Sequence, residues 1–187
     1  EYSDDLREIL ALADETRRAS NGYFDVKKPE GPIDPSGIVK GWAIQRTADL
    51  LRSRGHENAY VEVAGDLQLY GTNEDNAPWR IGIRNPENRD ENIKIVELRD
   101  KGIATSGTAE RGPHIYDPHM RAPVETPVRS ITVIGPNVLE ADRFATAAFA
   151  MGTSGIHFIE ELPGFEAYQV DKNGIAVMTS GFHSYVV

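Results

Sequence analysis

The spacing of apolar residues along the chain predicts three helices. Residues 3–19 place apolar side chains on one helical face behind a Ser-Asp-Asp start, which is typical of a helix N-terminus. Residues 38–54 show the same spacing and are followed by Gly55, a common helix stop. Residues 137–151 begin at an Asn and keep an apolar face to their end. We therefore expect two helices in the first third of the chain and one near its end.

Segments rich in β-branched and aromatic residues predict the strands. The final two flank Asp171-Lys172-Asn173-Gly174, a turn sequence typical of a β-hairpin. Because no regular helices separate the strands, we expect an α+β fold with a mostly antiparallel sheet packed with helices. The predicted strands are 59–70, 79–83, 93–98, 130–134, 166–170 and 175–179.

Composition narrows the class of protein. The 187 residues carry 20 basic and 29 acidic side chains, a net charge of −9, which argues against nucleic acid as a partner. Cysteine is absent, so disulfides and thiolate catalysis are excluded. No apolar run approaches the roughly 20 residues of a membrane span, so we expect none in this chain. The length favours a single domain over residues 1–187.

The first candidate site is the segment Asp34-Pro35-Ser36-Gly37-Ile38-Val39-Lys40-Gly41, a glycine-flanked turn that runs into a helix. Free N–H groups at such a helix start attract anions, and Lys40 could hold a phosphate as a point charge. The alternative is a capped helix start with an exposed lysine. The common GxxxxGK[ST] and HExxH signatures do not occur in the sequence.

A second candidate is the polar stretch Thr105–Thr108, continued by Glu110–Pro118. We expect these residues to form a glycine-rich connection that does not pack a core and that a scaffold positions for function. His114 is a candidate general base, because an unperturbed imidazole titrates near neutral pH. The alternative is a turn-rich connection with a solvated histidine.

Two aspartates need separate interpretations. Asp142 and Thr146 are four residues apart on a predicted helix, so they share a face and offer the hard oxygen ligands that Mg²⁺ prefers. The alternative is a first-turn charge beside a threonine that bonds back to its own helix. Asp66, after Ala64 and Gly65, is expected to be a buried turn residue.

Six segments, taken together in order and spacing, resemble the ApbE family of flavin transferases. The resemblance covers about residues 5–182 and does not depend on any single motif. The segments are Gly22-Tyr23-Phe24-Asp25, Asp34–Ala43, Ala64-Gly65-Asp66, Pro78–Ile83, Ala104–Pro118 and Ala141–Gly152.

The resemblance implies a T-fold-related α+β architecture and a defined reaction. Family members require Mg²⁺, split FAD, join FMN through a phosphoester bond to a Thr or Ser of an acceptor flavoprotein, and release AMP. Alternatives at the same site are an FAD pyrophosphatase that gives FMN and AMP, or a flavin-binding module without turnover. The family also begins upstream of the position of Glu1, so we expect its N-terminal segment, with further FAD contacts, to be lacking here. A homodimer is a further expectation.

The resemblance also assigns roles to residues, position by position. Catalytic roles fall on Asp142, through the metal, and on His114, which would assist the acceptor hydroxyl. The implied Mg²⁺ ligands are Asp142, Thr146, the carbonyl of Gly37 and backbone atoms of Ala145. The implied FAD contacts are Tyr23, Phe24, Asp25, Asp34, Lys40 and Ile115.

Overall fold

A six-stranded antiparallel sheet forms the middle of the molecule. The computed structural model describes residues 2–27, 31–88, 90–108 and 115–187. Neighbouring strands run in the order β1-β2-β5-β8-β9-β10, and each pair is antiparallel. The strands are β1 (Ala59–Val63), β2 (Asp66–Tyr70), β5 (Gly102–Gly107), β8 (Val128–Gly135), β9 (Glu166–Asp171) and β10 (Ala176–Met178). The predicted α+β class with a mostly antiparallel sheet is confirmed.

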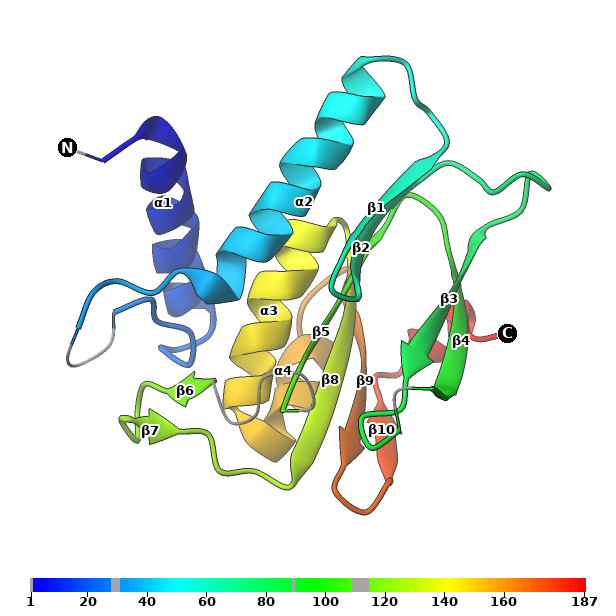
Figure 1. Cartoon of the computed structure of the whole chain (residues 1–187). Helices are drawn as coiled ribbons and strands as arrows, with labels where there is room; N and C mark the ends of the chain where they lie inside the picture. Colours follow the sequence, from blue (N-terminus) through cyan, green and yellow to red (C-terminus); the bar gives the residue numbers. More distant parts are fainter. Residues whose placement is uncertain (1, 28–30, 89, 109–114) are drawn as a thin grey trace.

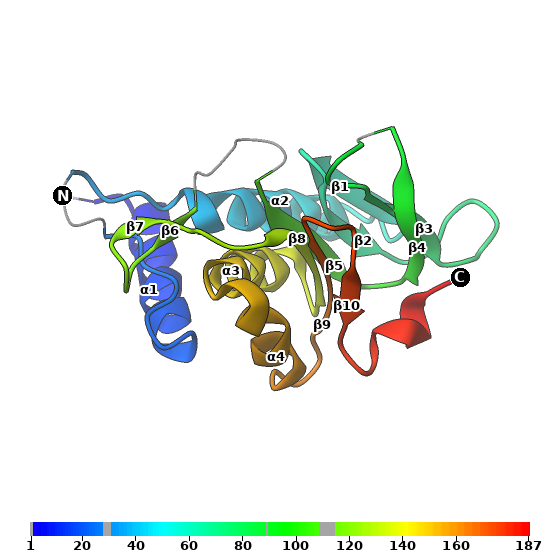
Figure 2. The same ribbon diagram turned by 90° about the horizontal axis from the view of Figure 1, so that it is seen from below.

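Helices cover one face of the sheet and a hairpin covers the other (Figures 1 and 2). The helical side holds α2 (Ser36–Ser53), α3 (Val138–Ala150), η1 (Gly152–Ser154) and α4 (Gly155–Glu160), with α1 (Asp4–Ala19) outside α2 and α3. The opposite side holds the hairpin of β3 (Trp79–Arg84) and β4 (Asn92–Leu98), together with η2 (Phe182–Tyr185). A small ribbon of β6 (Tyr116–Asp117) and β7 (Ala122–Pro123) lies apart from the main sheet.

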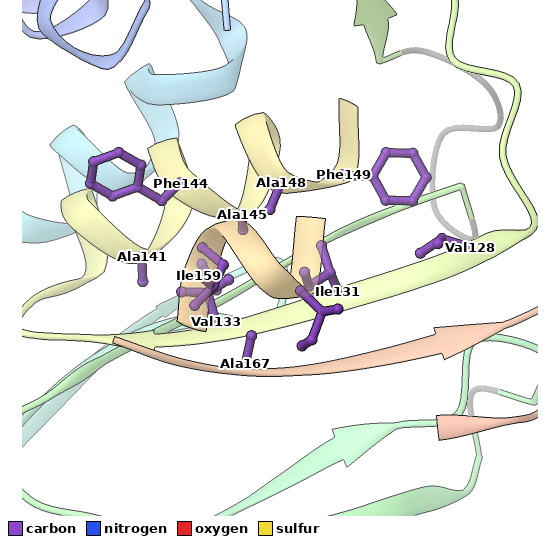
Figure 3. Close-up of a cluster of buried hydrophobic side chains, with 12 residues drawn as sticks. Val128, Ile131, Val133, Ala141, Phe144, Ala145, Ala148, Phe149, Ile159 and Ala167 are labelled. Atoms are coloured by element: carbon purple, nitrogen blue, oxygen red, sulfur yellow. The ribbon is translucent and has the colours of Figure 1, made fainter. Parts of the chain in front are cut away.

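The alternation of side chains between the two faces of the sheet divides the core into two layers. Ala104 and Val133 belong to the cluster under α3, whereas Ile103 and Ile134, their chain neighbours, pack with the β3–β4 hairpin. Successive residues of a strand point to opposite faces, which explains the division. Figure 3 shows the α3 layer, in which small alanines let Phe144 and Phe149 flank a close helix–sheet contact.

Local signals account for the helix boundaries. Ser3 caps α1 by accepting a hydrogen bond from the Leu6 amide at 3.3 Å. Asn137 caps α3 by accepting one from the Glu140 amide at 2.9 Å. The predicted helices are confirmed, although α2 begins two residues earlier than expected. Within the described ranges, no helix is both long and apolar enough to cross a bilayer.

One prediction about the strands is incomplete and one is wrong. Residues 59–70 are extended, as predicted, but they form the hairpin β1–β2, which turns at Ala64 (φ 51°) and Gly65 (φ 88°). Residues 105–107 are not part of a connection without a core: they belong to β5, where Ile103 and Ala104 are buried between β2 and β8. The short apolar run of β5 is too weak a local signal, and pairing with both neighbours forms the strand. Helix α4 was not predicted.

Candidate active site

A cleft of about 580 Å³ lies where the start of α2 meets the sheet and the β3–β4 hairpin. Most of the residues to which the sequence resemblance gave roles line it, although they are spread from residue 23 to residue 146. Those in the lining are Tyr23, Phe24, Asp25, Asp34, Gly37, Lys40, Ile115, Asp142 and Thr146. Ala145 is outside the lining, because its side chain packs in the core under α3. The predicted base His114 lies outside the described residues.

Two glycines allow α2 and α3 to approach each other closely at the cleft. A Cβ at Gly37 would lie 2.9 Å from Cγ2 of Thr146, and a Cβ at Gly41 would lie 2.7 Å from Cβ of Asp142. The Gly41 amide donates to Oδ2 of Asp142 at 2.7 Å. The Thr146 hydroxyl donates to the Gly37 carbonyl at 3.4 Å. Gly37 and Gly41 are four residues apart on α2, and Asp142 and Thr146 are four apart on α3, so each pair lies on one helix face. The two faces therefore contact each other at both positions.

A buried charge cluster lies beside this crossing. Asp142 is 4% exposed and Asp66 is 1% exposed. Nζ of Lys40 lies 2.6 Å from Oδ2 of Asp66, and the Thr105 amide donates to Oδ1 of Asp66 at 3.0 Å. Burial and the nearby Asp66 carboxylate raise the pKa of Asp142 to about 7, against the opposing effects of Lys40 and the Gly41 amide.

Asp66 lies behind the cleft wall, where it pairs with the lining residue Lys40, a contact that the sequence did not predict. Asp66 is buried, as predicted, but its carboxylate forms an ion pair with Lys40 in addition to its place at the turn. It begins β2 directly after the Ala64–Gly65 turn, and its position in the motif Ala64-Gly65-Asp66 was the available signal.

Hydroxyls and aromatic rings complete the lining. The Ser106 and Thr146 hydroxyls lie 3.3 Å apart, which links β5 to α3. The ring of Tyr60 on β1 meets the ring of Trp79 on β3 edge-on, with centroids 5.2 Å apart. The Trp79 indole N–H donates to the Tyr70 carbonyl at 3.0 Å, which holds this ring in place.

The donor set at the helix crossing fits a hard divalent cation. Within the described ranges, no three acidic or histidine side chains gather closely enough to hold a metal by themselves. The crossing instead offers one carboxylate, one hydroxyl and one carbonyl oxygen, from Asp142, Thr146 and Gly37. Mg²⁺ takes oxygen ligands and keeps several waters, so a few protein oxygens suffice. A bound cation would also offset the negative charges that raise the pKa of Asp142.

The fold and the cleft define an α+β domain in which Lys40, Asp142 and Thr146 line one cleft. The ApbE family model matches residues 26–169. The chain therefore belongs to the ApbE family, as the ordered motifs predicted.

The chain is also similar to curated proteins that are named as flavin transferases. The "FAD:protein FMN transferase" of Vibrio cholerae is 36% identical over 166 residues, which cover 84% of this chain and 48% of the relative. The protein of the same name from Escherichia coli K12 is 29% identical over 177 residues, which cover 88% of this chain and 50% of the relative. The chain thus spans about half the length of these curated relatives.

Solved structures have the same fold. The flavin transferase ApbE from Vibrio cholerae matches with a TM-score of 0.84 and 25% identity, over 98% of this chain and 77% of that structure. The ApbE protein from Thermotoga maritima matches with a TM-score of 0.88 and 22% identity, over 99% of this chain and 79% of that structure. The second likeness concerns the fold alone.

Proposed function

We propose that this chain is a Mg²⁺-dependent FAD:protein FMN transferase. It cleaves the diphosphate of FAD, attaches FMN through a phosphoester bond to a Thr or Ser of an acceptor flavoprotein, and releases AMP. The observation that carries this proposal is the single cleft in which Lys40, Asp142 and Thr146 come together with the Tyr23-Phe24-Asp25 segment. The names of the curated relatives agree with it.

The reaction breaks the phosphoanhydride bond of the diphosphate and forms a phosphoester bond. The acceptor hydroxyl oxygen attacks the phosphorus of the FMN half, and the bond from that phosphorus to the bridging oxygen breaks. AMP leaves with the bridging oxygen, and the hydroxyl proton passes to a base, for which His114 is the predicted residue. A hydroxyl is a weak nucleophile at neutral pH, so a base typically contributes about 10²–10⁴-fold to the rate.

Lys40 is suited to the phosphoryl charge. Its ammonium lies at the cleft wall on the first turns of α2, held by Asp66 at 2.6 Å. A fixed cation there stabilises negative charge on phosphoryl oxygens without having to reorganise during the reaction. Asp142, Thr146 and the Gly37 carbonyl would hold Mg²⁺, with backbone atoms of Ala145 as a further predicted ligand. Bound Mg²⁺ supplies charge neutralisation at the phosphoryl oxygens.

The rest of the cleft is suited to a dinucleotide. A volume of about 580 Å³ lies within the roughly 300–1,000 Å³ of small-molecule sites. Phe24 is buried, and its amide donates to the Ser20 hydroxyl at 3.1 Å, so the Tyr23-Phe24-Asp25 segment is held against α1. Tyr23, Phe24, Asp25, Asp34 and Ile115 are the proposed FAD contacts beside Lys40.

One incubation tests the proposal. The chain is mixed with FAD, MgCl₂ and an acceptor domain, and the acceptor is weighed by intact mass spectrometry. We expect the acceptor to gain the mass of one FMN, with an equal amount of AMP released. Free FMN and AMP with no gain in mass would instead indicate a pyrophosphatase. FAD that stays bound and intact would indicate a flavin-binding module.

A pair of variants provides the control. Asp142→Asn removes the carboxylate at the helix crossing and should abolish transfer. Asp5→Asn makes the same change of charge on α1, where the side chain is 60% exposed and outside the cleft, and should leave transfer unchanged. Transfer retained by Asp142→Asn would contradict the metal role of this residue.

A further inference from the structure

The β6–β7 ribbon begins directly after a residue of the cleft. Ile115, a proposed FAD contact, lines the cleft, and its carbonyl accepts the Val124 amide at 2.9 Å where the ribbon closes. Both residues pack against the core under α3, which holds the base of the ribbon. In the described part of the chain, the ribbon has two residue pairs and forms a sheet of its own. Two strands alone are at best marginally stable, so the tip of the ribbon needs a contact of its own.

The His119 side chain connects this tip to the turn that follows α1 (Figure 1). Its Nε2 donates to the Asn21 carbonyl at 3.0 Å, since a carbonyl oxygen can only accept. The imidazole also meets the ring of Tyr23 edge-on, with centroids 4.5 Å apart. Asp117 shapes the tip, because its Oδ1 accepts the His119 amide at 2.8 Å and the Met120 amide at 3.2 Å. The histidine is therefore held in place on the ribbon while it contacts the turn.

The turn after α1 is a rigid partner for this contact. The Gly22 amide donates to the Arg17 carbonyl at 2.7 Å. The Asn21 amide donates to the Arg18 carbonyl at 3.3 Å. With Asn21 at φ 51°, these two bonds form the Schellman motif that ends many helices. The helix end thus fixes the backbone next to Tyr23, whereas the orientation of the Tyr23 ring depends on side-chain contacts such as the one with His119.

We propose that His119 is a positioning residue that fixes the β6–β7 ribbon to the turn after α1, and so holds Tyr23 and Ile115 in the places where they contact FAD. This inference rests on the proposed function, since it takes FAD as the ligand. His119 is exposed and outside the cleft lining, so it acts through these two residues and does not touch the nucleotide.

Hydrogen–deuterium exchange tests the anchor without any ligand. His119→Ala loses both the hydrogen bond and the ring contact, so residues 115–124 should exchange their amide hydrogens faster than in the parent. The β9–β10 turn, residues 171–175, joins two strands of the main sheet and should exchange at an unchanged rate. His56→Ala is the matched control, because His56 is exposed after α2 and outside the cleft lining. It should behave like the parent.

The affinity for FAD, titrated by flavin fluorescence in MgCl₂, tests the consequence for the cleft. We expect His119→Ala to bind FAD roughly three- to tenfold more weakly, because a hydrogen bond and an aromatic contact are each of modest strength. His119→Gln keeps an N–H for the Asn21 carbonyl, and His119→Phe keeps a ring for Tyr23, so each should recover part of the affinity. A residue that only supported the fold would lower the melting temperature, which should stay close to that of the parent in all three variants.

Several results would overturn the inference. These are exchange of residues 115–124 at the parent rate in His119→Ala, an FAD affinity of His119→Ala equal to that of the parent, no recovery in His119→Gln or His119→Phe, or a large fall in melting temperature. A parent chain that transfers FMN while a variant gives one of these results refutes only the inference about His119. A parent chain that binds no FAD even in MgCl₂ refutes the proposed function, and the inference falls with it.

Discussion

The close contact of α2 with α3 makes a quantitative prediction at Gly41. Replacement by alanine in the middle of an exposed helix usually stabilises a protein by about 0.5–1 kcal/mol, because glycine loses more backbone freedom on folding. At Gly41 the new methyl group would lie 2.7 Å from Cβ of Asp142 and 3.0 Å from Cα of Leu139. The second contact is with backbone, which cannot rotate away. Overpacking of this kind costs about 1–3 kcal/mol.

The gain in helix propensity and the cost of overpacking oppose each other, and we expect the cost of overpacking to be larger. We expect Gly41→Ala to lower the free energy of unfolding by up to about 2 kcal/mol, measured by urea denaturation. Ala43 lies at an exposed position of the same helix, so Ala43→Gly measures the difference in helix propensity by itself. It should lower the free energy of unfolding by about 1 kcal/mol. The helix separation forced by Gly41→Ala should also weaken Mg²⁺-dependent FAD binding, which Ala43→Gly should leave intact.

Two results would contradict a steric clash at Gly41. If Gly41→Ala stabilised the protein by as much as Ala43→Gly destabilises it, the methyl group would meet no steric resistance. Unchanged FAD binding in the same variant would then show that the site does not depend on the close approach of α2 and α3.

Three more outcomes are expected. The pKa of Asp142 rises on folding from 3.8 to about 7, so between these values the folded state binds more protons and stability falls as pH increases. In EDTA, Asp142→Asn should therefore gain stability over the parent from pH 4 to pH 8, reaching roughly 2–4 kcal/mol by thermal or urea unfolding, and no gain would contradict the raised pKa. Thr146→Val should lose the rise in melting temperature that MgCl₂ gives the parent, whereas Thr146→Ser should keep it; a full rise in Thr146→Val would exclude the hydroxyl as a ligand. Asn137→Ala removes the cap of α3 and should cost about 1 kcal/mol of unfolding free energy, with FAD affinity unchanged as the check that the effect is local.

Much of the site was accessible from the sequence because motif order carries information that single residues lack. Asp142 with Thr146, and Asp34 with Lys40, each had an ordinary structural explanation when considered separately. Their order and spacing along the chain identified the family, and the cleft contains them all. Asp66 belonged to the same motifs, but a buried aspartate after a turn gives no local sign that it will meet a lysine 26 positions earlier in the chain.

The amino-acid sequence alone determined the three long helices, because helix periodicity and capping residues are local properties. It also excluded disulfides and thiolate catalysis, because the content of cysteine is a simple count. Strand β5 and the β1–β2 turn depended on partners. Gly102–Gly107 becomes a strand because β2 and β8 lie on either side of it, and Ala64 adopts a positive φ because the hairpin requires it. Only the tertiary structure brought Lys40 to Asp66 and both to Asp142, because long-range strand pairing and the glycine-lined contact of α2 with α3 decide which distant residues meet.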